Sequence, residues 1–334
     1  MPVAMRRGTV PGPFLPGEGR EGLRRAGWQT KPADPFCSDV AREQRASLGG
    51  TATRADAWLV LEHPGPWGER AIEENDLPGE VQSWLAAQVE ALRPALGKVR
   101  PLLGRRPDAT TSQRSCFLAV AREERQDLYR FDVSRIEELA QLDLAALAGD
   151  GALERFRSDR PLALVCGNGR RDRCCARRGP GTWQALAPLL GGDAWLSTHQ
   201  GGHRYAATGL CLPAGVAYGF LGPEEAEPLA AAVRSRAVHL RCFRGRTFHA
   251  VQVQAADAML RIARGAAALD AWRLSEAVDE GSGRWRVGFS RADGGSHTVR
   301  LRHDSEEVLV SCSPGKVKPI DRFTAIAIDG EESA

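Results

Sequence analysis

The chain has 334 residues, of which 43% are hydrophobic, so it can bury a sizeable core as two domains or as one enlarged α/β domain. Its 45 basic and 42 acidic side chains give a formal net charge of +3, which is too balanced to favour nucleic acid as the main partner. No apolar run in the sequence approaches the roughly 20 residues that cross a bilayer, so no membrane partner is expected.

Residues 1–35 contain arginines, prolines and glycines but no apolar segment like that of a secretory signal, and we predict a disordered leader. Without such a signal we expect a cytoplasmic protein. Its reducing surroundings favour free thiols and metal ligands over disulfides among the eight cysteines. Cys116 and Cys211 lie inside strand-like runs, and we expect them to be buried and reduced.

Residues 36–155 alternate between strand and helix patterns and predict a mixed α/β region. A strand over 58–62 runs into a turn-rich loop at 64–68. Apolar residues at helical spacing predict helices over 81–92 and near 135–147. Three further strands are expected, at 99–103, 116–121 and 127–131.

Residues 156–265 are expected to form a thioredoxin-like domain, because residues 162–233 follow the order β-α-β-loop-β-β-α. The first strand is a short continuous apolar run, as in a buried parallel strand. A last helix, capped by Thr247, is predicted to run through Arg264. The strands are expected at 162–165, 194–197, 210–212 and 216–220, and the two earlier helices near 182–190 and 223–233.

Residues 266–334 predict a β-rich C-terminal extension that forms an antiparallel meander. Strand patterns at 284–289, 298–302 and 308–311 are separated by turn-like residues at 293–295 and by the acidic stretch 304–307. The sequence shows no internal repeat. The overall prediction is an α/β protein with a thioredoxin-like domain between two additions.

Two cysteines and two histidines follow two of the predicted strands. Cys166 and Cys175 occupy the loop after one strand, and His199 and His203 the loop after the next. In open α/β sheets such loops at the carboxyl ends of strands bind ligands, so the two pairs can converge. The spacer Gly201-Gly202 argues against a helix and predicts a tight loop that lets the backbone approach a cofactor.

Thiolates and imidazoles suit zinc or an iron–sulfur cluster better than calcium or magnesium. A zinc-finger spacing is absent, because eight residues separate Cys166 from Cys175, but a structural Cys2His2 zinc site between two loops remains an alternative. A 2Fe-2S cluster needs ligands for two irons, which two separate pairs supply naturally. A thiol oxidoreductase is the other alternative, although the chain has no Cys-x-x-Cys motif.

The whole pattern resembles the sucrase/ferredoxin-like family of thioredoxin-like 2Fe-2S ferredoxins, over most of residues 37–265. The resemblance implies four ligands, Cys166, Cys175, His199 and His203, with the cysteines on one iron and the histidines on the other. It favours Cys175 over its neighbour Cys174. The motifs that carry it are Cys166-x3-Arg170-Arg171-Asp172-x-Cys174-Cys175, His199-x-Gly201-Gly202-His203-Arg204, Cys37-Ser-Asp39, Gly49-Gly-Thr51 and Leu61-Glu-His-Pro-Gly-Pro-Trp-Gly68.

The resemblance implies an electron-transfer protein rather than a stand-alone enzyme. Because imidazole ligands can lose a proton, we expect electron and proton transfer to be coupled. Positive charge near the cluster would favour its reduced state and guide an acidic partner, such as a reductase or flavoprotein. The residues expected beside the ligands or at the docking surface are Arg170, Arg171, Asp172, Cys174, Gly201, Gly202 and Arg204.

Overall fold

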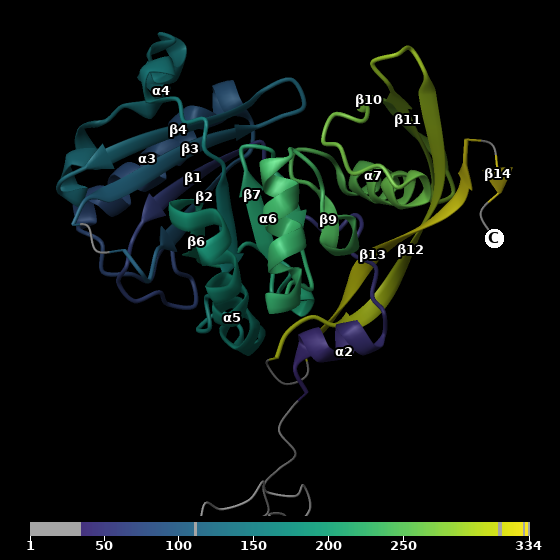
Figure 1. Ribbon diagram of the computed structural model, residues 1–334, viewed down its shortest axis with the longest axis horizontal. Coiled ribbons are helices and arrows are strands. Elements are labelled where there is room, and N and C mark those ends of the chain that lie inside the picture. Colours follow the sequence, from purple (N-terminus) through teal and green to yellow (C-terminus); the bar gives the residue numbers. More distant parts are fainter. Residues whose placement is uncertain (1–34, 110–111, 313–315, 330, 333–334) are drawn as a thin grey trace, which may run out of the picture. The chain divides into compact units, whose positions relative to one another are not determined.

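The computed structural model describes residues 35–109, 112–312, 316–329 and 331–332, and residues 35–334 form one compact unit (Figure 1). The leader predicted over 1–35 lies outside the described residues, except for Pro35. The main sheet has nine strands in the order β4-β3-β1-β2-β6-β5-β7-β8-β9. Their bounds are β1 (Ala57–Glu62), β2 (Val99–Arg105), β3 (Arg114–Ala121), β4 (Gln126–Val133), β5 (Leu162–Cys166), β6 (Ala194–Ser197), β7 (Gly209–Leu212), β8 (Val216–Tyr218) and β9 (Phe243–Arg246).

The central strands are buried on both faces, which explains their continuous apolar sequences. In β1, Leu59 and Leu61 face one core and Trp58 and Val60 face the other. The first core is covered by α3 (Gly79–Leu96), α5 (Arg173–Leu190) and α6 (Ala226–Arg234). The α/β fold class predicted from the sequence is therefore confirmed.

The main sheet contains the same topology twice. In the first half β1 is parallel to β2 and antiparallel to β3, which pairs with β4, and α3 connects β1 to β2. In the second half β5, β6, β7, β8 and α5 repeat this arrangement strand for strand. The sequence shows no recognisable period, so this repeated topology was not predicted from it.

The two halves join where β2 and β6 pair antiparallel through their last residues, Gly104 with Ser197 and Arg105 with Leu196. Thr198, just beyond β6, continues this junction. Its amide donates to the Leu103 carbonyl over 2.8 Å, and its hydroxyl accepts from the Leu103 amide over 3.0 Å. The loops that follow β5 and β6 therefore lie next to the end of β2 in the first half.

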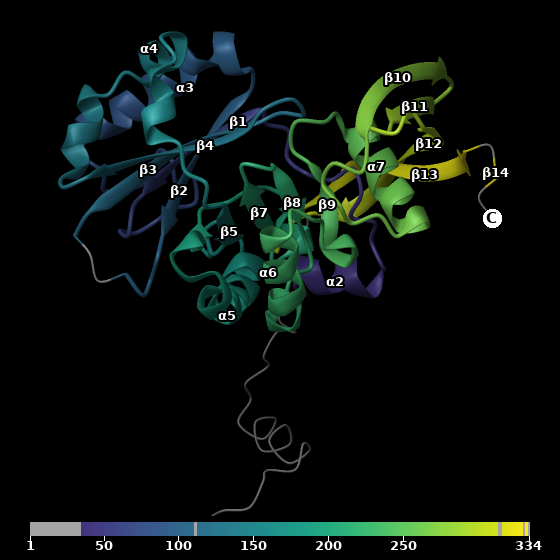
Figure 2. The same cartoon turned by 45° about the horizontal axis from the view of Figure 1, so that its top comes forward.

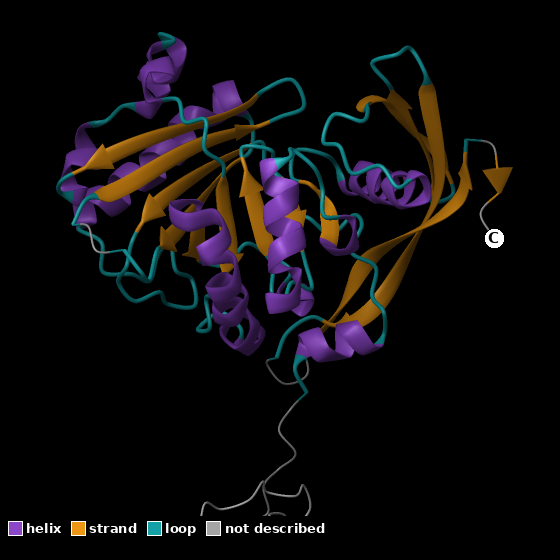
Figure 3. Ribbon diagram, in the orientation of Figure 1, coloured by secondary structure: helices purple, strands orange, loops and turns teal. Residues whose placement is uncertain are grey.

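A second, five-stranded antiparallel sheet has the order β10-β11-β12-β13-β14 and packs on α7 (Val251–Arg264), which confirms the predicted meander. Its two longest strands form a ribbon that runs down to α2 (Cys37–Glu43) near the start of the described chain (Figures 2 and 3). The bounds are β10 (Arg273–Gly281), β11 (Arg284–Ser290), β12 (Ser296–Leu309), β13 (Val317–Ile328) and β14 (Glu331–Glu332). The ribbon thus brings the C-terminal extension back to the N-terminal helix.

Three local predictions need correction. The acidic stretch 304–307 is not a turn but lies within β12, which also ends inside the separately predicted strand 308–311, because β13 offers it partners such as Arg322, 3.6 Å from Glu306. The helix expected near 135–147 is divided into a 3-10 turn, Ile136–Gln141, and α4 (Leu144–Gly149), whose N-cap is Asp143. Thr247 does not cap α7, which begins at Val251; its hydroxyl lies 3.4 Å from the Trp58 indole nitrogen instead.

Candidate metal centre

Cys166 and Cys175 lie at opposite ends of the connection between β5 and α5. Cys166 is the last residue of β5, and Cys175 lies in the first turn of α5. The helix was expected near residue 182 but starts at Arg173, because the Asp172 carboxylate caps it by accepting from the Cys174 amide over 2.9 Å. Cys175 is therefore held by a helix rather than by a loop, and both thiols are fully buried.

His199 faces both of these thiols. Its Nδ1 atom lies 3.9 Å from Cys166 Sγ and 4.0 Å from Cys175 Sγ. The neighbour Gln200 fixes the loop by donating from Nε2 to the Leu164 carbonyl over 3.1 Å and to Ser197 Oγ over 2.7 Å. The sequence-predicted loops therefore converge, and three of the four expected ligands form one group of donor atoms within 4.8 Å of one another.

His203 lies on the far side of His199 from the thiols. Its Nδ1 atom is 3.4 Å from His199 Nε2, and its Nε2 atom is 3.6 Å from an Asp172 carboxylate oxygen. Nε2 is buried and has no hydrogen-bond partner among the described residues. Burial lowers the pKa of His203, so the imidazole is neutral and able to bind a metal near neutral pH.

The two thiols share a proton unequally. The pKa of Cys166 lies well below its ordinary value, because the Cys175 thiol donates to it and His199 lies beside it. The pKa of Cys175 is raised correspondingly, mainly by that same hydrogen bond to Cys166. A thiolate beside a thiol and an imidazole is a group of atoms prepared to take up a soft metal ion.

The Gly201-Gly202 spacer is required by two protein side chains that press against it. Both residues have positive φ, +91° and +76°. A Cβ at Gly201 would meet Thr53 Oγ1, and a Cβ at Gly202 would meet the Arg244 guanidinium. The close approach predicted here is thus made by Thr53 and by buried Arg244, which donates from Nη1 to the Gly201 carbonyl over 3.1 Å. Neither residue stood out in the sequence.

Cys174 points away from this centre, as the residue beside Cys175 on a helix must. Its Sγ atom lies 3.5 Å from Cys37 Sγ and 3.1 Å from Cys312 Sγ. Cys174 is therefore part of a separate group of thiols and not a substitute for Cys175 at the His199 side. The sequence did not connect Cys37, which was named only in a motif, or Cys312 with Cys174, because both lie more than 130 residues from Cys174 along the chain.

The arginines near the centre differ in their surroundings. Arg170 is exposed, and Arg171 donates to Glu69 over 3.1 Å. Arg177 and Arg178 both bind Asp39 on α2, so their charges serve an internal contact. The arginine-rich segment therefore offers fewer charges to a partner than its sequence indicates.

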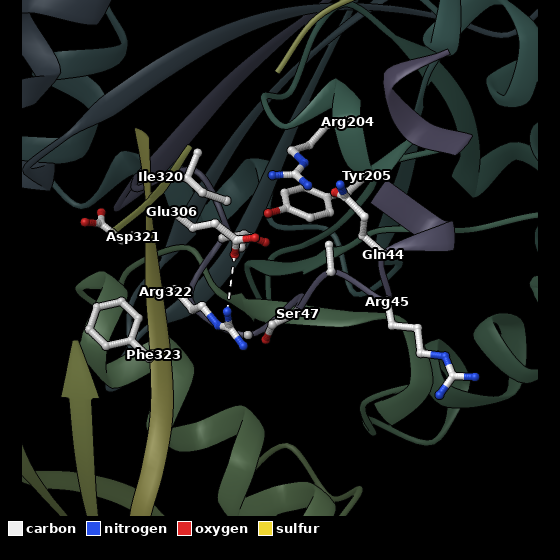
Figure 4. A pocket seen from close by; sticks show the side chains of 13 residues that line it. Gln44, Arg45, Ser47, Arg204, Tyr205, Glu306, Ile320, Asp321, Arg322 and Phe323 are labelled. Atoms are coloured by element: carbon white, nitrogen blue, oxygen red, sulfur yellow. Dashed lines mark ion pairs between the residues drawn. The ribbon is translucent and has the colours of Figure 1, made fainter. Parts of the chain in front are cut away.

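Arg204 is buried next to His203. Figure 4 shows it beside Tyr205 in a pocket of about 150 Å³, whose lining also includes Glu306 and Ile320 from the β12–β13 ribbon. Its Nε and Nη1 atoms have no hydrogen-bond partner among the described residues. The guanidinium thus places positive charge over the Tyr205 ring, 5.2 Å from its centroid.

A model of the sucrase/ferredoxin-like family matches residues 48–245, more than half of the chain. The chain belongs to this family. No curated protein and no solved structure matches it. The match covers Cys166, Cys175, His199 and His203 of this sucrase/ferredoxin-like protein, whereas Cys37 and Cys312 lie outside it. No helix in the described part of the chain is long and apolar enough to cross a membrane.

The donor atoms of this sucrase/ferredoxin-like protein fit a metal centre with sulfur and nitrogen ligands. Two thiols and an imidazole already face one another, and Nδ1 of a second imidazole lies 3.4 Å from the first imidazole. The absence of carboxylates from this group agrees with a soft or borderline metal. Cys166, Cys175, His199 and His203 are therefore suited to hold iron or zinc.

Gly179 should be indispensable for the position of Cys166. A Cβ at Gly179 would lie 2.1 Å from the Cys166 carbonyl oxygen, so Gly179→Ala must push α5 away from β5. We expect a loss of about 1–3 kcal/mol in the free energy of unfolding, measured in urea, together with loss of bound metal. Gly181→Ala is the matched control: its Cβ would meet only Pro223 Cγ at 4.0 Å, so stability should stay equal or rise. Equal stability of the two variants would contradict the tight contact.

Proposed function

We propose that this protein carries a 2Fe-2S cluster held by Cys166, Cys175, His199 and His203, and that it transfers single electrons. The convergence of two buried thiols on His199, with His203 in contact behind it, supports this ligand set most directly. Such a cluster supplies reversible one-electron chemistry, and imidazole ligands raise its reduction potential relative to a cluster with four cysteines. Membership of a ferredoxin-like family agrees with this role.

The imidazole side of the centre is the side from which electrons would enter and leave. Both cysteines are fully buried, whereas His199 is partly exposed. His199 and Arg171 line a groove of about 1170 Å³ that also borders α3 and β2. We propose that an acidic reductase or flavoprotein docks there, guided mainly by exposed Arg170, since Glu69 already pairs with Arg171.

Asp172 would couple the electron to a proton. Burial tends to raise the pKa of Asp172, but hydrogen bonds from the Cys312 thiol and from the Cys174 and Cys312 amides lower it to about 2. The carboxylate therefore stays ionised. Its oxygen lies 3.6 Å from His203 Nε2, where a negative charge favours the protonated imidazole. Protonation at this nitrogen would balance the negative charge that reduction adds.

Anaerobic purification followed by iron and sulfide analysis tests the cluster. We expect about two iron atoms and two sulfides per chain, and an EPR signal in the reduced protein. His199→Cys and His203→Cys should each change that spectrum while the cluster remains. A colourless protein with zinc in place of iron would reject the proposal in favour of a structural zinc site, and unchanged spectra in both variants would remove the histidines from the ligand set.

The midpoint potential should fall as the pH rises. A reduced centre that takes up a proton is stabilised at low pH. When one proton accompanies each electron, the midpoint potential changes by about −59 mV per pH unit. A redox titration followed by visible absorption between mildly acidic and strongly alkaline pH measures this slope. A potential that stays constant over that range would exclude proton coupling.

A further inference from the structure

A second group of donor atoms lies behind the cluster-binding helix. The thiols of Cys37, Cys174 and Cys312 form a triangle, with Sγ–Sγ distances of 3.5 Å, 3.1 Å and 3.7 Å. An Asp172 carboxylate oxygen belongs to the same group, in which all donor atoms lie within 4.8 Å of one another. We call these four residues the three-thiol site.

The three-thiol site is enclosed by three segments that are far apart in the sequence. Cys37 is the first residue of α2, Cys174 lies in the first turn of α5, and Cys312 follows β12. All three cysteines are at most 6% exposed, and Ala206 completes the buried cluster with them. Among the described hydrophobic residues only Phe36 and Leu309 pack against this small cluster, so three of its four buried members are thiols and a contact between the thiols themselves is expected to stabilise it.

Backbone amides around the site are arranged to stabilise negative charge. The Ser38 amide donates to Cys174 Sγ over 3.4 Å. The Asp172 carboxylate accepts from the Cys174 amide over 2.9 Å, from the Cys312 amide over 3.0 Å and from Ser311 Oγ over 3.0 Å. Metal-binding carboxylates and thiolates are commonly oriented by such hydrogen bonds.

We propose that Cys37, Cys174 and Cys312, with Asp172 as the fourth ligand, bind a single zinc ion. Thiolates bound to one tetrahedral zinc at about 2.3 Å lie about 3.8 Å apart, close to the separations found here. A disulfide would use two of the thiols and leave the third without a role. A four-iron cluster binds each cysteine to a different iron and would hold the sulfurs much farther apart.

This zinc ion would tie α2 and the segment that follows β12 to the cluster-binding helix. Cys37 and Cys312 belong to segments outside the family match at 48–245, whereas Cys174 is adjacent to the cluster ligand Cys175. Asp172 contacts both centres, because the same carboxylate lies 3.6 Å from His203. The terminal additions are thus fixed at the place where they cover the second histidine.

Metal analysis of the full chain tests the three-thiol site. The wild-type protein should contain about one zinc ion beside the iron of the cluster. Cys37→Ser/Cys312→Ser should lose the zinc and keep the iron, and the matched control Cys116→Ser/Cys211→Ser, which changes two other buried cysteines, should keep both metals. Cys166→Ala/Cys175→Ala should lose the iron and keep the zinc. Loss of zinc from this last variant alone would place the zinc at the first centre and overturn the proposal.

A measurement on the unmodified protein avoids any effect of the substitutions on folding. Zinc X-ray absorption should show three sulfur neighbours at about 2.3 Å and one oxygen. Two sulfur and two nitrogen neighbours, a protein without zinc, or a disulfide between Cys174 and Cys312 found by mass spectrometry after alkylation would each refute the site. Because iron content is read separately, failure of this zinc site is distinguishable from failure of the proposed cluster.

Discussion

Cys175→Ala should strip the protein of iron, whereas Cys174→Ala should leave its iron content unchanged. Cys175 Sγ lies within 4.0 Å of His199 Nδ1, while Cys174 Sγ faces Cys37 and Cys312. Loss of one of four ligands opens the centre and removes the thiol that donates to the Cys166 thiolate. Iron per chain and the visible spectrum measure the outcome, with a fall from about two iron atoms to almost none in Cys175→Ala.

Cys211→Ala serves as the control for the loss of a buried thiol. Cys211 is buried in β7 and belongs to no described group of metal-ligating side chains. Its iron content should match that of the unmodified protein. If Cys175→Ala keeps its iron, Cys175 is not a ligand. If Cys174→Ala loses its iron at the same time, Cys174 is the ligand instead.

Asp257→Ala should destabilise the whole fold by about 3–5 kcal/mol, because it leaves the buried charge of Arg261 without its partner. The two side chains are 3% and 1% exposed and form an ion pair of 2.9 Å. Asp257 also accepts from Trp272 Nε1 over 2.7 Å, and Arg261 donates to the carbonyls of Ala266, Ala268 and Leu269. This network fixes the end of α7 to the chain that leads into β10.

Urea unfolding of Asp257→Ala, compared with Glu90→Gln, measures this effect. Glu90 pairs with Arg93 over 2.7 Å on the surface, where their side chains are 63% and 53% exposed. Glu90→Gln should therefore lower the free energy of unfolding by less than about 1 kcal/mol. Asp257→Ala/Arg261→Met should recover part of the lost stability, since it removes the unpaired charge. A loss in Asp257→Ala no larger than in Glu90→Gln would show that the buried pair contributes little.

The positions of β1 to β8 along the chain and the convergence of the two ligand-bearing loops were accessible from the sequence for physical reasons. Buried strands such as β5 are short apolar runs, and a cysteine or histidine that follows one must lie at an edge of the sheet. The start of α5 was not accessible, because Gly179, Pro180 and Gly181 resemble a loop although they lie inside the helix. Its cap, Asp172, acts through a hydrogen bond that only the folded chain reveals.

Contacts between distant segments were the other part that the sequence could not provide. Nothing in the residues around Cys37 or Cys312 indicates that they meet Cys174, because the approach depends on the length and pairing of β12 and β13. The proposed ligand set at the first centre remains a prediction that the metal analyses above decide. The expected domain boundaries at 155/156 and 265/266 also stay predictions.

The repeated topology of the main sheet has the form of a symmetric dimer joined into one chain, with β2 and β6 as its shared contact. Strand pairing aligns Glu62 with Gly104 in the first half and Cys166 with Ser197 in the second. Two residues farther on, Arg106 therefore occupies the place of His199. The first half has an ion pair there, with Arg106 Nη2 lying 3.8 Å from Glu62 Oε1, where the second half has a thiol and an imidazole. Equivalent places in the two halves thus hold different chemistry, an ion pair in the first half and candidate metal ligands in the second.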